Sequence, residues 1–172
     1  GTFNLHASLL PQYRGAAPIN WAIINGERET GVTTFMLNPR MDEGAVIASR
    51  RVAIAEEDNA GTLHDKLMAT GAQLVTESVD AVAAEGFRPE PQPVVETLKP
   101  APKIFKETCH VDFSAEGERI VDLVRGVSPY PGAWGMLRER SAEEGSLVRE
   151  GIVKIYAADF QPDAQVRVAP GS

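Results

Sequence analysis

Two side chains near the start of the chain, Asn4 and His6, have the chemistry of a catalytic pair. Residues 2–6 (TFNLH) have the pattern of a short β-strand, and alternate strand residues project from the same face. A carboxamide and an imidazole offer hydrogen-bond donors, and the imidazole titrates near neutral pH. They suit a reaction in which an oxygen gains negative charge while a proton moves. On the spacing alone, a strand end with satisfied polar groups remains the somewhat better explanation.

The sequence around this pair carries much more information than the pair itself. Residues 4–34 read NLHASLLPQYRGAAPINWAIINGERETGVTT. This run resembles the active-site signature of the folate-dependent formyltransferases, in the form typical of the methionyl-tRNA formyltransferase family. Three later segments extend the resemblance: KIFKETCHVDF at 103–113, VRGVSPYPGAW at 124–134 and VKIYAAD at 153–159.

Asp42 is the third candidate catalytic residue. An Asp close before a Gly usually belongs to a turn, where its side chain binds nearby backbone N–H groups. The resemblance, however, implies a catalytic aspartate in a turn of the form hydrophobic-Asp-x-Gly, after the strand that follows the signature. Residues 41–44 (MDEG) match that form.

The resemblance implies transfer of a formyl group from 10-formyltetrahydrofolate to the α-amino group of initiator methionyl-tRNA. Asn4 and a protonated His6 would then donate hydrogen bonds to the oxyanion, and Asp42 would orient and stabilise His6. The residues implied to contact the folate are Ser8, Leu9, Leu10 and Pro11. This chemistry needs no metal and no covalent intermediate.

The rest of the chain predicts an α/β fold in three parts. We expect residues 1–87 to be the C-terminal part of a formyltransferase catalytic domain with a Rossmann-like parallel sheet. Residues 88–102 contain five prolines and predict an extended linker. Residues 103–172 should form part of an OB-like β-barrel. The predicted strands are 2–6, 30–37, 46–54, 134–137, 151–157 and 165–168; the predicted helices are 16–25, 59–85 with a cap at Thr62 and Asp65, and one that begins at Ser114.

Composition favours a globular protein of a reducing compartment. The hydrophobic fraction is 43% and the net charge is -7, which gives no general electrostatic reason to bind nucleic acid. Cys109 is the single cysteine, and the three histidines, His6, His64 and His110, lack metal-ligand spacing. We expect a cytoplasmic monomer of bacterial type with no membrane association; the alternative location is an organelle.

The signature strand stands at the very start of the chain, and the family has further strands upstream of it. We therefore expect an internal fragment that lacks the N-terminal half-domain and the end of the C-terminal domain, and that folds poorly and is inactive alone. Alternatives are the hydrolase-like domain of 10-formyltetrahydrofolate dehydrogenase, a formyltransferase for small-molecule amines, and an inactive fragment that only binds folate or tRNA.

Overall fold

The computed structural model describes residues 1–140 and 147–162. Its first part is built on a three-stranded sheet in the order β1 (Phe3–His6), β2 (Glu29–Met36) and β3 (Val46–Ala53). Both strand pairs are antiparallel, so the expected parallel pairing is wrong for these strands. For β2 and β3 the short connection gives the physical reason, because a parallel pair needs a crossover of a dozen or more residues.

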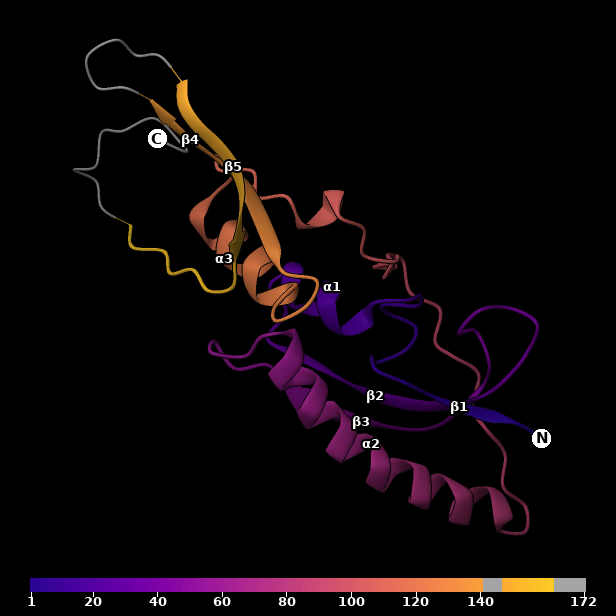
Figure 1. Cartoon of the computed structure of the whole chain (residues 1–172). Helices are drawn as coiled ribbons and strands as arrows, with labels where there is room; N and C mark the ends of the chain where they lie inside the picture. Colours follow the sequence, from indigo (N-terminus) through magenta and orange to yellow (C-terminus); the bar gives the residue numbers. More distant parts are fainter. Residues whose placement is uncertain (141–146, 163–172) are drawn as a thin grey trace.

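Helix α2 (Ala60–Ala83) covers one face of the sheet, as Figure 1 shows. Its buried residues Leu63, Leu67 and Leu74 form one core with Val32 of β2 and Ile23 of the short helix α1 (Pro18–Ile24). The N-terminus of α2 is capped differently from our prediction. The Asn59 side chain accepts from the Thr62 backbone N–H, and the Thr62 side chain accepts in return from the Asn59 N–H. Asp65 is not part of this cap, because the helix begins one turn earlier than the predicted cap requires.

The opposite face of the sheet carries Asn4 and His6 of β1, paired in register with Phe35 and Thr33 of β2. Two loops approach this face. One is the loop after β1, residues 7–17, and the other is the turn between β2 and β3, residues 37–45. The candidate site lies where these two loops meet.

The proline-rich segment at residues 88–102 is extended, as predicted, but it is bound to the first part of the chain. The Tyr13 N–H donates to the Lys99 carbonyl at 2.7 Å, and the Ala101 N–H donates to the Arg14 carbonyl at 2.9 Å. Unlike a free spacer, this segment runs alongside the loop after β1 and helps to hold it.

The second part packs helix α3 (Gly117–Gly126) against the hairpin of β4 (Ala133–Arg140) and β5 (Leu147–Ile155), with a short 3-10 turn, η1, at Glu107–Cys109. Ser114 does not cap α3, because its hydroxyl donates to the Asp112 carboxylate instead. Within residues 103–140 and 147–162 the only sheet is this two-stranded hairpin, so a barrel is not seen there. The predicted strand at 165–168 lies outside the described residues.

Helices α1 and α3 pack against each other and join the two parts into one elongated body (Figure 1). The Arg125 guanidinium donates to the carbonyl of Asp58 at 2.8 Å and to that of Ala55 at 2.9 Å. The Asn20 amide donates to the Gly126 carbonyl at 2.7 Å. Within the described ranges, no helix is long and apolar enough to cross a membrane.

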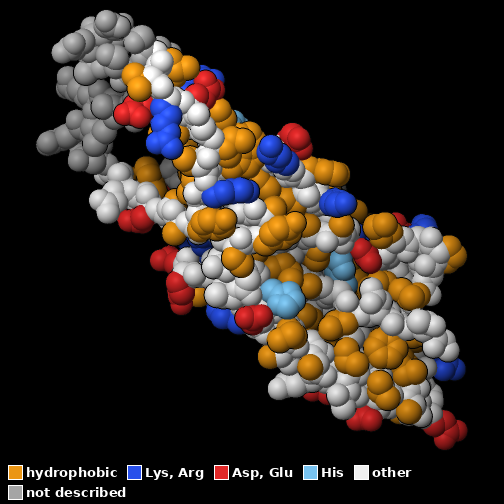
Figure 2. Space-filling model, in the orientation of Figure 1, with side chains coloured by type: hydrophobic (Ala, Val, Ile, Leu, Met, Phe, Trp, Pro, Cys, Tyr) orange, Lys and Arg blue, Asp and Glu red, His pale blue; other side chains and the backbone are white. Residues whose placement is uncertain are grey.

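On the face that Figure 2 shows, Lys and Arg side chains lie scattered among hydrophobic and uncharged ones. The described residues on this side therefore present no continuous basic surface. This distribution agrees with the overall negative charge of -7.

Candidate active site

His6 is the centre of the site and stands at the end of β1. Its ring is buried, with 7% of the side chain exposed. The Nε2 atom lies 2.8 Å from the carbonyl oxygen of Tyr13, which can only accept, so Nε2 carries the hydrogen. The Nδ1 atom is left to face Asp42. Asn4 lies two residues earlier on the same face of the strand and is exposed.

Asp42 comes to His6 from the turn between β2 and β3. Its Oδ2 atom lies 3.8 Å from Nδ1 of His6 and accepts a hydrogen bond of 2.9 Å from the Gly15 N–H. Asp42 has a φ of 53°, a left-handed conformation that few non-glycine residues adopt. The structure therefore brings together His6 at the end of β1 and Asp42 of the turn between β2 and β3, and Asn4 lies on the same strand face as His6.

This geometry is suited to acid–base chemistry on an acyl group. The Asp42 carboxylate beside Nδ1 and the Tyr13 carbonyl on Nε2 together fix the orientation of the imidazole ring. The exposed amide of Asn4 can donate to an oxygen that develops charge above the strand end.

Thr33 of β2 holds the backbone of residues 8–11, the segment predicted to contact folate. The Thr33 hydroxyl donates to the Ser8 carbonyl at 2.7 Å and accepts from the Leu10 N–H at 3.2 Å. The side chains of Ser8, Leu10 and Pro11 are buried, and the Ser8 hydroxyl donates to the Gln12 carbonyl. A ligand at this segment would therefore meet backbone groups and the half-buried Leu9, and not the Ser8 hydroxyl.

A polar cluster behind the loop after β1 supports Tyr13, the residue whose carbonyl holds His6. The Tyr13 hydroxyl donates to the Glu27 carboxylate, which also pairs with Lys99. Burial and the bond to Glu27 raise the pKa of Tyr13 well above its usual value. Burial alone would raise the pKa of Glu27, but the hydrogen bonds from Lys99 and Tyr13 outweigh it and leave this pKa below its usual value.

Sequence reasoning missed three groups that complete the site. Two are backbone groups, the carbonyl of Tyr13 and the N–H of Gly15, which residue type does not reveal. The third is Gln92 of the proline-rich segment, whose side chain binds the backbone of the Asp42 turn. Of the three, only Gly15 stands out in the sequence, because a glycine directly after the SLLPQYR run indicates a break in regular structure. In the structure its φ is 128°.

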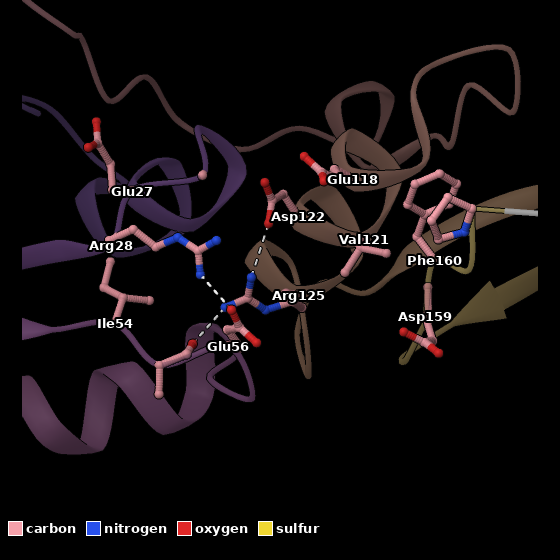
Figure 3. Close-up of a pocket in the computed structure, with 14 residues that line it drawn as sticks. Glu27, Arg28, Ile54, Glu56, Glu118, Val121, Asp122, Arg125, Asp159 and Phe160 are labelled. Atoms are coloured by element: carbon pink, nitrogen blue, oxygen red, sulfur yellow. Dashed lines mark hydrogen bonds and ion pairs between the residues drawn. The ribbon is translucent and has the colours of Figure 1, made fainter.

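A cleft of about 400 Å³ lies away from this site, between α3 and the end of β3. Figure 3 shows its lining, where Arg125 pairs with Asp122 and Arg28 pairs with Glu56. Burial raises the pKa of Asp122 despite the neighbouring Arg125. These two ion pairs occupy the four charged groups at the centre of the lining, and we place no chemistry there. Within the described residues, no group of three or more His, Cys, Asp or Glu could hold a metal ion.

Comparison with known proteins identifies the class to which this fold and site belong. Residues 1–79 match the family described as formyl transferase, and residues 103–172 match the formyl transferase C-terminal domain. The chain belongs to the formyltransferase family.

Particular relatives narrow the similarity further. The chain is 58% identical over 163 residues to the methionyl-tRNA formyltransferase of Phocaeicola vulgatus, covering 92% of this chain and 48% of that protein. It is 51% identical over 175 residues to the methionyl-tRNA formyltransferase of Bacteroides fragilis, covering 100% of this chain and 52% of that protein. The chain thus spans about half the length of the curated relatives that it matches.

A solved structure shares the fold. HypX from Aquifex aeolicus, in complex with tetrahydrofolic acid, superposes with a TM-score of 0.67 at 23% sequence identity. The match covers 81% of this chain and 26% of that one.

Proposed function

We propose that the complete protein transfers a formyl group from 10-formyltetrahydrofolate to the α-amino group of initiator methionyl-tRNA. The observation that carries the proposal is the buried imidazole of His6, held between the Tyr13 carbonyl and the Asp42 carboxylate at the end of β1. The relatives at 51% and 58% identity that are named methionyl-tRNA formyltransferase support this acceptor.

In the proposed reaction, the amine attacks the formyl carbon and the carbonyl electrons move to its oxygen. Asn4 and the Nδ1–H of a protonated His6, whose Nε2–H stays on the Tyr13 carbonyl, donate hydrogen bonds to that oxygen, which is most negative in the tetrahedral intermediate. Asp42 stabilises the imidazolium and relays the proton that the amine loses, directly or through water. The intermediate collapses when the bond to the folate nitrogen breaks, and that nitrogen takes up a proton.

The segment 8–11 gives the folate a preformed surface in this proposal. Thr33 fixes its backbone, so its free N–H and carbonyl groups can bind the edge of a flat heterocycle while Leu9 packs against it. The chemistry requires no metal.

Further parts of the complete protein belong to the same proposal. The outer edge of β1 has no partner strand within the described residues, and we propose that additional strands pair there to give a Rossmann-like sheet. Residues 103–172 would belong to an OB-like domain that binds the tRNA, after the segment 88–102. We propose a cytoplasmic monomer.

A competition assay tests the acceptor. The complete protein is given 10-formyltetrahydrofolate with methionyl-tRNA, a ribonucleotide amine and an amino sugar, and the formylated products are quantified. We expect methionyl-tRNA to be used in clear preference. Equal or better use of the ribonucleotide amine or the amino sugar would instead favour a formyltransferase for small-molecule amines.

A further inference from the structure

Gln92 is half-buried, whereas residues 93–100, which follow it in the proline-rich segment, are exposed. Its side-chain amide makes contacts at both ends. The Nε2 atom donates to the carbonyl of Asp42 at 2.7 Å and to that of Gly44 at 2.9 Å. The Oε1 atom accepts from the Arg14 guanidinium at 2.6 Å and 3.2 Å. Two carbonyls on one side and a guanidinium on the other fix the orientation of the amide, because a flipped amide would lose all of these bonds.

These contacts reach the catalytic aspartate through its backbone. Asp42 has a φ of 53°, and a non-glycine residue holds such a conformation only where its surroundings fix it. Gln92 binds the carbonyl of Asp42 itself and that of Gly44, two residues on, so it holds the turn that directly follows this strained torsion. The carboxylate of Asp42 is aimed at His6 from the same turn.

The contact with Arg14 reaches the other side of the imidazole. Arg14 lies between Tyr13, whose carbonyl binds Nε2 of His6, and Gly15, whose N–H binds Asp42. Gln92 therefore connects the loop whose Tyr13 carbonyl holds the His6 ring to the turn that carries Asp42.

We propose that Gln92 is a positioning residue for the Asp42–His6 pair, and that the proline-rich segment is thereby a working part of the active site as well as a connection to the second part. This inference rests on the proposed formyl transfer. Gln92 touches no reacting atom, so its effect passes through Asp42. Its loss should therefore lower kcat and leave the affinity for both substrates nearly unchanged.

The test uses three variants of the complete protein. Gln92→Glu keeps an oxygen for Arg14 but removes both donors to the turn, Gln92→Ala removes every contact, and Glu96→Gln is a matched control at an exposed position of the same segment. We expect kcat for formyl transfer to fall about tenfold in both Gln92 variants, with each KM within about twofold of the original protein. The control should be unchanged. Values of kcat within twofold for both Gln92 variants would overturn the inference.

A double substitution separates positioning from general support of the fold. If Gln92 acts through Asp42, adding Gln92→Glu to Asp42→Asn should cause little further loss of kcat. A full additional tenfold loss would show that Gln92 acts elsewhere.

The Gly15 amide gives a readout that does not depend on activity. This N–H donates to the Asp42 carboxylate. If Gln92→Glu displaces the carboxylate, the hydrogen bond weakens, so the Gly15 amide resonance should move upfield and the amide proton should exchange faster with solvent. An unchanged Gly15 resonance would refute the positioning role. If the original protein fails to formylate any acceptor, the proposed function fails, while this resonance still decides what Gln92 does.

Discussion

Replacing Thr33 by valine should destabilise the protein strongly although the two side chains have nearly the same shape. Thr33 is 1% exposed, and its hydroxyl makes two hydrogen bonds, to the Ser8 carbonyl and from the Leu10 N–H. Valine would leave both backbone groups buried without a partner. Each such group costs about 1–3 kcal/mol, so we expect the two together to lower the free energy of unfolding by about 2–6 kcal/mol.

Urea denaturation followed by circular dichroism measures this loss in the complete protein, with Thr76→Val as the matched control. Thr76 is exposed on α2 and its hydroxyl only bonds the Ala72 carbonyl of its own helix, so we expect a change within about 0.5 kcal/mol. Because Thr33 also fixes the proposed folate segment, its variant should raise KM for 10-formyltetrahydrofolate more than KM for methionyl-tRNA. If Thr33→Val were as stable as Thr76→Val, the reasoning about the buried hydroxyl would be refuted.

Two further predictions concern the loop after β1 and the start of α2. Gly15→Ala should lower the free energy of unfolding by about 2 kcal/mol or more in a urea titration, because the new Cβ would stand 2.4 Å from the Ala101 carbonyl oxygen at a φ of 128°; Gly151→Ala, with open space around it, is the control. For Asp58, burial would raise the pKa, but the bonds from Lys66, the Ala55 N–H and the Thr62 hydroxyl lower it below its usual value. The ionised Asp58 should therefore add its full share to the free energy of unfolding above its unfolded pKa of about 3.9. This stabilisation should be lost as the pH falls through the lower folded pKa. The stability difference between the original protein and Asp58→Asn should shrink over that acidic range, and a constant difference would contradict the assignment.

The local sequence predicted the strands and helices well, because each has a clear pattern. The alternation in residues 2–6 and the β-branched run at 30–37 correspond to β1 and β2, and the apolar stripe at 59–85 corresponds to α2. The cap of α2 was wrong because Asn59 and Thr62 form a capping box by themselves, without the acidic partner that we expected.

How the strands pair and where the proline-rich segment lies could not be predicted in the same way. The parallel sheet came from the family resemblance, and it was wrong for β1 to β3, although the short chain between β2 and β3 already favoured an antiparallel pair. Proline content predicts an extended segment but says nothing about what it binds. The hydrogen bonds of Lys99 and Ala101 to the loop after β1 are backbone contacts that depend on the tertiary fold.

The candidate site was predictable only in part for a related reason. The spacing of Asn4 and His6 indicates a shared strand face, but Asp42 is 36 positions farther along than His6 and could be chosen only by resemblance. Its approach to His6 within 3.8 Å depends on a left-handed turn. Gln92 was missed altogether, because a glutamine between prolines has no pattern that distinguishes it from an exposed linker residue.

If His6 acts in the transition state of formyl transfer, its replacement by alanine should lower kcat. Steady-state formylation of methionyl-tRNA by the complete protein gives kcat and both KM values, with His64→Ala, whose side chain is 59% exposed on α2, as the control histidine. Because loss of one oxyanion donor costs on the order of a hundredfold, we predict a fall in kcat of about that size or more with KM little changed, and an unchanged control. A His6→Ala variant that retained its kcat and raised only KM would rule out a transition-state role for His6.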